Sequence, residues 1–376
     1  MNDARLDLDA CAQEPIHIPG SIQPHGAMLV ANRTSQEITH AAGDVARILG
    51  RDVWLGRTLG EVLGDALAER VAQVTSSGAQ SGFAGHIDGG DGAYDVSAHL
   101  DGERLIVEAE PAIGAPMPAV VLLAQLEAAG AAFERAASVK SLCDRAAVEF
   151  RRLTGFDRVM IYRFLEDDAG AVLAEDLTDG MPSFLNHHFP GSDIPAQARA
   201  LYVRNLVRVI PDVSYSPAPL IPAWNEPTPL DMSDCALRSV SPVHMQYLRN
   251  MGVAASASVS IVKDGVLWGL IACHHREPKL MPYDIRAAAR ALAGGLARQI
   301  RAKEEAEAYR ERLRLRGLED EVTSRLARIG GLDANIGAGV ADLRRMFGAD
   351  GVAVLRGGER FTDGALPPDD AIGPLA

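Results

Sequence analysis

The sequence predicts an α+β protein with two complete domains and the beginning of a third. With 376 residues, the chain is long enough for two or three domains of ordinary size. Short apolar runs bounded by Gly, Asp and Pro alternate with stretches of helical period, which is typical of antiparallel sheets flanked by helices. Hydrophobic residues make up 47% and charged residues 23% of the chain, as in a folded globular protein.

The net charge of −13 argues against several classes of partner. A strongly acidic chain has no general basic field to attract phosphate backbones or anionic lipid. The longest apolar runs, at 119–126 and 253–262, are shorter than the ~18–20 residues that span a bilayer. The N-terminus MNDARLDLDA lacks the basic and apolar regions of a secretory signal. We therefore expect a cytoplasmic protein, with no nucleic acid and no membrane as partner.

The first domain is expected at residues 21–118, after an extended arm at 1–20 that shows no regular period. A strand is expected at 26–30, and a helix at 44–49 follows. The turn sequences GGDG and DGE then separate further strands of a small antiparallel sheet. The Pro-rich segment 111–118 ends this domain.

The second domain is expected at residues 119–300. It begins with a helical pattern over 120–153. Strands are expected at 158–164, 171–175, 257–263 and 266–274. The last two are joined by Asp264-Gly265, which is a hairpin signal. The irregular insertion at about 211–240 has six prolines in its first twenty residues, and a long insertion of this kind is usually functional.

A helical pattern continues beyond residue 285 and gives a helical linker at 301–330. Thirteen of the 21 residues at 301–321 are charged with mixed signs, as on a solvated helix. The remaining segment, 331–376, contains a helical patch and the hairpin GVAVLR-GG-ERFTDG. Because about 45 residues are few for an independent domain, we expect this to be the start of a third one.

The residues alone suggest three kinds of site. A thiol enzyme could use Cys11 or Cys273 with a histidine and Asp193, although Cys273 follows an apolar strand that favours a buried, inert thiol. A metal site is disfavoured, because the adjacent histidine pairs 187–188 and 274–275 would each offer one inward ligand. A pocket for a large anionic ligand explains more of the chain. Its carboxylate-binding candidates are Arg204, Arg208, Arg238 and Arg249.

Four segments resemble the signature sequences of bacterial phytochromes, photoreceptors that carry the linear tetrapyrrole biliverdin. These segments are CAQEPIHIPGSIQPHG, FPGSDIPAQARALY, SPVHMQYLRNMG and LWGLIACHH. The resemblance implies a PAS domain at 21–118, a GAF domain at 119–300 and a truncated PHY domain at 331–376. It also implies a figure-of-eight knot, in which the N-terminal arm passes through the GAF insertion with Ile22 inside the loop.

The resemblance further implies the residues of a biliverdin site. Cys11 would form a covalent thioether with the pigment, and Cys235 would stay unattached. Asp193, in the motif with Ile194 and Pro195, would offer a carbonyl to the pyrrole nitrogens, although by itself it is more typical of the N-cap of the following helix. Arg208 and Arg238 would bind one propionate. The remaining implied contacts are His244, Ser256 and Ser258 for the other propionate and a bound water, His274 for the ring D carbonyl, and Tyr162, Phe189, Tyr202 and Tyr247 around ring D.

By the same resemblance, the chain would sense red and far-red light through Z/E isomerisation at the bridge between rings C and D. The long helix after residue 285 would carry the signal, and the chain would form a homodimer through its GAF and linker helices. No catalytic motif is present, so a histidine kinase output that acts on a response regulator would lie outside this chain. A shortened PHY domain leads us to expect a poor far-red state and raised fluorescence. A GAF sensor without a bilin and a thiol-dependent enzyme remain the alternatives.

Overall fold

The computed structural model describes residues 14–76, 81–114, 117–328, 332–368 and 371–372. The chain divides into two compact units, Met1–Arg301 and Ala302–Ala376. Within the described residues, no helix has both the length and the apolar character needed to cross a membrane.

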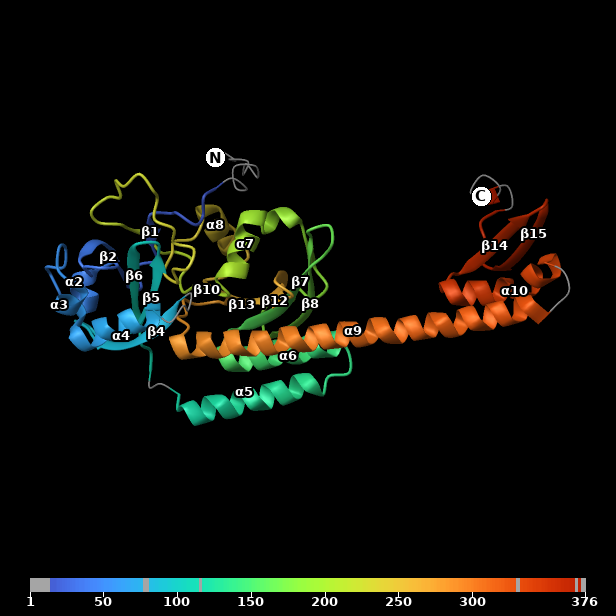
Figure 1. The fold of residues 1–376 in the computed structure, drawn as a ribbon, viewed down its shortest axis with the longest axis horizontal. Coiled ribbons are helices and arrows are strands. Elements are labelled where there is room, and N and C mark those ends of the chain that lie inside the picture. Colours follow the sequence, from blue (N-terminus) through green and yellow to red (C-terminus); the bar gives the residue numbers. More distant parts are fainter. Residues whose placement is uncertain (1–13, 77–80, 115–116, 329–331, 369–370, 373–376) are drawn as a thin grey trace. The chain divides into compact units, whose positions relative to one another are not determined.

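The first domain is a five-stranded antiparallel sheet in the order β3-β2-β6-β5-β4. Its strands are β2 (Ala27–Asn32), β3 (Ile38–Ala42), β4 (Gly82–Asp88), β5 (Ala93–Asp101) and β6 (Arg104–Pro111). One face is covered by α2 (Val45–Leu49), α3 (Leu59–Leu63) and α4 (Asp65–Ser76) (Figure 1). The expected helix at 44–49 is confirmed as α2, and the Asp44 carboxylate caps it by accepting from Arg47 N at 3.1 Å.

Helices α3 and α4 fall in a stretch where the sequence predicts no helix. Helix α3 has only five residues, whereas α4 has twelve, an ordinary helix length. The available signal was a capping box, in which the Thr58 side chain accepts from Glu61 N while the Glu61 carboxylate accepts from Thr58 N. Amphipathic period does not reveal a helix as short as α3, whereas the buried Leu67, Ala68 and Val71 of α4 have helical spacing that could have predicted it.

The second domain contains a six-stranded antiparallel sheet in the order β10-β12-β13-β7-β8-β9. Its strands are β7 (Arg158–Phe164), β8 (Gly170–Leu177), β9 (His188–Phe189), β10 (Val207–Ile210), β12 (Ala255–Lys263) and β13 (Val266–His275). Helices α5 (Ala119–Glu134), α6 (Val139–Thr154) and α9 (Tyr283–Arg328) contribute to the main core on one face. The opposite face carries α7 (Ala196–Arg204) and α8 (Pro242–Asn250) (Figure 1).

Two sequence expectations about this domain have clear outcomes. The hairpin at Asp264-Gly265 is confirmed, and both residues have positive φ, +53° and +78°, as a type I′ turn requires. The helical pattern over 120–153 is two helices rather than one. Helix α5 ends at Glu134, and α6 begins after Ser138, whose side chain caps it by accepting from Ser141 N at 3.2 Å.

The insertion, residues 211–240, packs on the other face of the first-domain sheet. Strand β2 is therefore buried on both sides: Leu29 belongs to the helix-covered core, whereas Met28 and Val30 belong to the cluster formed with Leu220 and Leu237 of the insertion. A strand with two buried faces reads as a continuous apolar run instead of an alternating one. This explains why AMLVA is apolar throughout.

The N-terminal segment lies between the two ends of the insertion. Strand β1 (Ser21–Ile22) pairs with β11 (Ala218–Pro219) on one side. On the other side, Gln23 N donates to Leu237 O at 2.8 Å. Ile22 is completely buried between them. These contacts show that both ends of the insertion flank Ile22, and passage through a closed loop remains a prediction.

Two neighbouring carboxylates on β6 join the first domain to the second. Glu110 accepts from Arg286 of α9, with Nη1 and Oε1 2.6 Å apart. Glu108 accepts from the backbone N–H groups of Ala236 and Leu237 in the insertion, at 3.0 and 2.7 Å. All three charged side chains are buried. Their pairing is required because an unpartnered buried charge is costly.

The second unit begins inside α9 and continues into α10 (Leu332–Phe347), β14 (Gly351–Arg356) and β15 (Glu359–Gly364). The expected hairpin is confirmed, and its turn residues Gly357 and Gly358 have positive φ. Arg344 of α10 pairs with Asp363 of β15, with Nε and Oδ2 2.5 Å apart. The hairpin is thus held against its helix.

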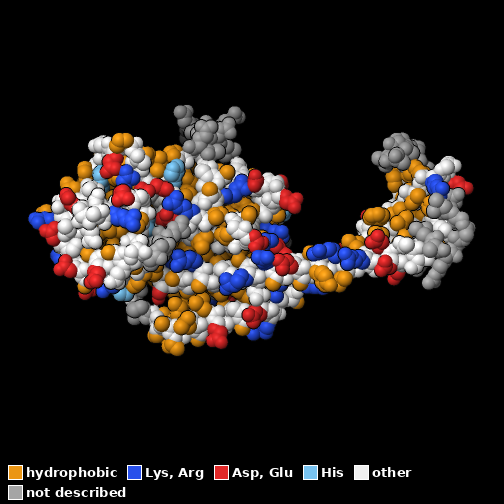
Figure 2. Space-filling view, in the orientation of Figure 1, with side chains coloured by type: hydrophobic (Ala, Val, Ile, Leu, Met, Phe, Trp, Pro, Cys, Tyr) orange, Lys and Arg blue, Asp and Glu red, His pale blue; other side chains and the backbone are white. Residues whose placement is uncertain are grey.

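Hydrophobic side chains gather on the surface over α5 (Figure 2). Val120 and Leu123 are 73% and 64% exposed there. An exposed apolar patch is typical of surfaces that contact another protein. Dimerisation of the chain through the helices of the second domain and the linker stays a prediction.

Replacing Arg286 with Met should lower the free energy of unfolding by about 3–5 kcal/mol, because the buried Glu110 would lose its guanidinium partner and keep only His25, whose Nε2 lies 3.6 Å from Oε1. The matched control is Arg57→Met, which removes an exposed pair with Glu61 (Nη1–Oε1 3.1 Å). Such surface pairs contribute about 0–1 kcal/mol. Urea unfolding measures both variants, and equal losses of stability would contradict the assignment.

Burial, reinforced by the charge of Glu110, raises the pKa of Glu108 to about 7. A carboxyl with a higher pKa in the folded than in the unfolded protein stabilises the fold below its unfolded pKa, and this contribution is lost as the pH rises through the folded value. Relative to Glu108→Gln, the wild-type thermal midpoint should therefore fall as the pH rises from about 5 to about 8. A difference in midpoint that does not change with pH would disprove this.

Candidate functional site

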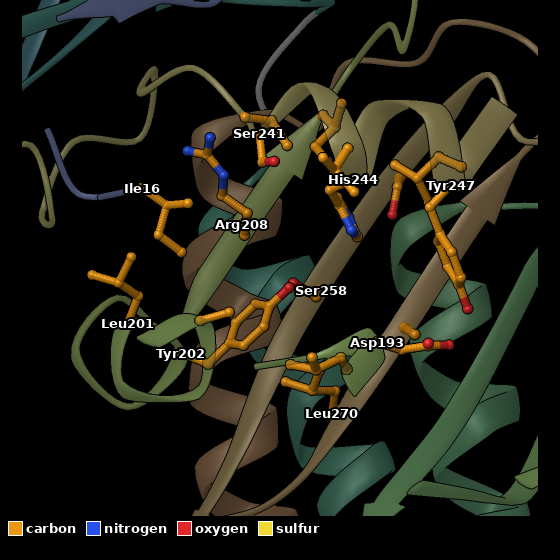
Figure 3. Close-up of a pocket in the computed structure, with 18 of the residues that line it drawn as sticks. Ile16, Asp193, Leu201, Tyr202, Arg208, Ser241, His244, Tyr247, Ser258 and Leu270 are labelled. Carbon is orange, nitrogen blue, oxygen red and sulfur yellow. The ribbon is translucent and has the colours of Figure 1, made fainter. Parts of the chain in front are cut away.

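A cavity of about 370 Å³ lies on the face of the second-domain sheet that carries α7 and α8 (Figure 3). This volume is within the ~300–1,000 Å³ of ordinary ligand pockets. Thirteen residues that the sequence singled out line it: Tyr162, Phe189, Asp193, Ile194, Pro195, Tyr202, Arg208, Arg238, His244, Tyr247, Ser256, Ser258 and His274. Cys11 lies outside the described residues.

The sheet forms the floor of the cavity. Strand register places its polar residues opposite one another, in the pairs Arg208–Ser258 and Ser256–His274. Successive side chains of a strand point to opposite faces. His274 therefore lines the cavity, while the preceding Cys273 packs in the main core.

Helix α8 supplies two rings to the cavity wall. His244 and Tyr247 are three residues apart and so lie on the same side of the helix. Their rings are stacked, with centroids 6.1 Å apart and an interplanar angle of 14°. Figure 3 shows His244 above the sheet strand that carries Ser258. Pro242 at the start of α8 favours helix initiation at this point.

Asp193 does not cap α7, so the local interpretation of this residue was wrong. The N-cap is Pro195, which makes no side-chain cap hydrogen bond. The Asp193 carboxylate instead accepts from the Tyr247 hydroxyl. Burial raises the pKa of Asp193, and this hydrogen bond partly offsets it. The pair connects the short 3₁₀ turn η1 (Gly191–Asp193) to α8.

The Tyr162 ring in the cavity wall packs closely against Gly170. A Cβ at this position would lie 1.7 Å from the Tyr162 ring, so only glycine leaves room for it. Tyr162 in turn lies near Phe189, with ring centroids 6.1 Å apart. Burial, with the charge of Asp193, raises the pKa of Tyr162 to about 12. Its hydroxyl therefore stays protonated.

Two arginines in the cavity wall are bound only to carbonyl groups within the described residues. Arg208 donates from Nη1 to Ala236 O at 3.0 Å and from Nη2 to Arg238 O. Arg238 donates from Nη1 to Met232 O and Ser233 O, both at 3.2 Å. Carbonyl acceptors orient the guanidinium groups without neutralising their charge. The arrangement therefore favours an anionic ligand.

The pKa shifts of these arginines point to the same conclusion. Burial, together with the charge of Arg238, lowers the pKa of Arg208 to about 9. Burial also lowers the pKa of Arg238. A lowered arginine pKa means that the surroundings disfavour the charged form, which a carboxylate would reverse.

The other two arginine candidates do not reach the cavity. Arg204 pairs with Asp231 (Nη1–Oδ2 2.9 Å) and with Asp234 (Nη2–Oδ2 2.6 Å). Arg249 donates to Val213 O at 2.9 Å. The motifs that contain these arginines gave no sign of these partners, because all three come from the insertion at 211–240.

The two cavity histidines are neutral near pH 7. Burial, followed by the charge of Arg208, lowers the pKa of His244 to about 4. Burial, followed by Arg158 and His244, lowers the pKa of His274 to about 3. Each ring consequently offers one donor and one acceptor to its neighbours.

The described thiols are not poised for nucleophilic attack. Cys273 is buried in the main core, and burial raises its pKa to about 12. Cys235 is buried between the insertion and the first-domain sheet, and burial raises its pKa as well. A nucleophile must be exposed and ionised, so the expectation that Cys273 is a buried, inert thiol is confirmed.

Several residues of the cavity were missed by the sequence analysis. Glu14 and Ile16 enter from the N-terminal segment, and the Ser241 hydroxyl donates to Glu14 Oε2 at 2.5 Å. Leu270 lies four residues before His274 on the same face of β13, so strand period could have identified it. Leu201 of α7 had no distinguishing signal, because an apolar helical residue is ordinarily part of a core.

Comparison with known proteins gives consistent matches along the chain. A PAS fold model matches residues 11–112, and a GAF domain model matches residues 138–301. A bacteriophytochrome of Xanthomonas campestris is 40% identical over 96% of this chain and 58% of its own length. The chain spans about half the length of the curated relatives it matches.

Two solved structures are similar over nearly the whole chain. The bacteriophytochrome RpBphP3 of R. palustris is 37% identical with a TM-score of 0.85, covering 98% of this chain and 75% of that one. The phytochrome photosensory core module of Stigmatella aurantiaca is 35% identical with a TM-score of 0.82, covering 97% and 74%. The chain therefore belongs to the bacteriophytochrome family and contains its PAS and GAF domains.

Proposed function

We propose that this chain is a red/far-red light sensor that binds biliverdin covalently in the cavity of its GAF domain. The observation that carries the proposal is the pair Arg208 and Arg238, two cationic groups that line the cavity bound only to carbonyl oxygens among the described residues. A pigment that carries propionate groups supplies the missing negative charge. Family membership supports a chromophore of the bilin class.

The residues of the cavity fit such a group in their chemistry. Arginines and small hydroxyl residues suit carboxylates, neutral histidines suit carbonyl and pyrrole groups, and aromatic rings suit a flat conjugated surface. When bound, biliverdin supplies absorption of red light and Z/E isomerisation at the bridge between its rings C and D.

The residues of the chain have separate tasks in this proposal. Arg208 and Arg238 bind one propionate, while His244, Ser256 and Ser258 face the other. The main-chain carbonyl of Asp193 accepts from pyrrole nitrogens. The aromatic residues limit the space for a rotating ring, and His274 donates to a ring carbonyl. A changed hydrogen bond at Asp193 or His274 would then favour one of two protein conformations, which α9 passes on to an output module.

We further propose that Cys11 provides the covalent attachment. Glu14 and Ile16 line the cavity, and Ser241 holds Glu14 there. Three residues of chain span at most ~11 Å, so position 11 cannot be farther than this from Glu14 in the cavity lining. The buried Cys235 and Cys273 are not in the cavity lining.

Mixing the protein with biliverdin should give a red-absorbing adduct that survives denaturation and shows zinc-induced fluorescence on the protein band. Cys11→Ser should lose the covalent signal while still binding pigment, and Cys235→Ala should retain it. A difference spectrum after red illumination tests the light response. A protein that stays colourless with excess biliverdin would instead favour a GAF sensor for another ligand.

The arginine clamp can be tested separately by measuring reversible pigment affinity in the Cys11→Ser background. Arg208→Met should weaken binding about 10- to 100-fold, because a hydrogen bond to a charged group is worth ~1.5–3 kcal/mol. Arg249→Met is the matched control, since its guanidinium bonds Val213 O outside the cavity lining. Equal affinities for the two variants would argue against the clamp.

A further inference from the structure

A buried arginine behind the cavity contacts one of its histidines. Arg158 begins β7 and lies opposite His274 of β13 in the sheet register. Its Nη2 is 2.8 Å from His274 Nδ1. The Arg158 side chain is completely buried, and it is not part of the cavity lining.

The chemistry of this contact decides which ring nitrogen carries the proton. A guanidinium group has N–H donors and no acceptor, and it stays protonated in proteins. His274 Nδ1 must therefore be the acceptor. A neutral imidazole that accepts through Nδ1 carries its proton on Nε2.

Arg158 is itself held in a fixed orientation. Its Nη1 donates to Pro182 O at 2.7 Å, and its guanidinium lies over the Phe184 ring, 4.2 Å from the centroid. Glu175, whose charge raises the pKa of Arg158 and partly offsets the effect of burial, accepts from Phe184 N at 2.9 Å and from the Ser183 hydroxyl. The segment 182–184 thus fixes Arg158 through one hydrogen bond and one ring contact.

The low pKa of His274 supports the same conclusion from another direction. Burial, followed by Arg158, lowers this pKa to about 3, so the ring is neutral near pH 7 and exists as one of two tautomers. Within the described residues, Nδ1 makes the ring's one hydrogen bond with the protein. This leaves Nε2 for a ligand.

We propose that Arg158 is a positioning residue that fixes the Nε2–H tautomer of His274, so that the cavity offers a hydrogen-bond donor there. At this position the site would then select a ligand with a carbonyl oxygen and disfavour one with an N–H or O–H donor. The identity of that carbonyl as part of a bilin rests on the proposed function. The assignment of the tautomer does not rest on the proposed function.

The first test uses the wild-type apoprotein and needs no pigment. Two-bond nitrogen–proton correlation in protein labelled with ¹⁵N-histidine reports which ring nitrogen is protonated, and His274→Phe identifies the signal. The expected result is protonated Nε2 and bare Nδ1. Finding the proton on Nδ1 would overturn the proposal without any variant of Arg158.

The second test compares Arg158→Met with Arg163→Met, a control on the same strand whose guanidinium lies over Trp268, 5.3 Å from its centroid. In Arg158→Met, the His274 signals should move toward a mixture of tautomers, and in the control they should not move. With biliverdin loaded, the carbonyl stretch that responds to His274→Phe should shift upward in Arg158→Met, with covalent loading retained.

These readouts separate the two proposals. A protein that binds no biliverdin would refute the light-sensor assignment, while the apoprotein tautomer would still decide the role of Arg158. An unchanged His274 tautomer in folded Arg158→Met would show that another group fixes the ring.

Discussion

Two guanidinium groups that have carbonyl but no carboxylate partners among the described residues determine the character of the cavity. Arg208 and Arg238 are oriented by backbone oxygens of residues 232–238, which fix their direction and leave their charge uncompensated. Placing positive charge in a partly apolar cavity costs free energy that an anionic ligand recovers. The neutral state of His244 follows partly from the same charge.

This arrangement depends on the first domain. Glu108 of β6 binds the backbone N–H groups of Ala236 and Leu237, directly beside the carbonyls that hold Arg208. Ile22 fills the space between the ends of the insertion. The first-domain sheet therefore acts as the support for a ligand site in the second domain. Long irregular segments keep one conformation only when such contacts offset their conformational entropy.

Much of the site could be predicted from the residues because its motifs are long and ordered along the chain. The segments around Asp193, His244 and His274 each lie on a different element, and the fold brings them to one cavity. The local interpretation of Asp193 as a helix cap was wrong because Tyr247, a partner from a distant helix, takes its carboxylate. Arg204 and Arg249 were equally plausible in sequence, and only their tertiary partners exclude them.

The sequence by itself determined the α+β class, the positions of most strands and the hairpin turns, because period and turn chemistry are local properties of the chain. It also identified the family, since each of the four signature segments is an uninterrupted run of residues. Tertiary structure alone decided that β2 is buried on both faces, that Glu108 supports the insertion, and that Arg158 lies against His274 and so decides which ring nitrogen carries the proton. These features join residues more than a hundred positions apart, and their energies come from burial and hydrogen-bond geometry that no local pattern encodes.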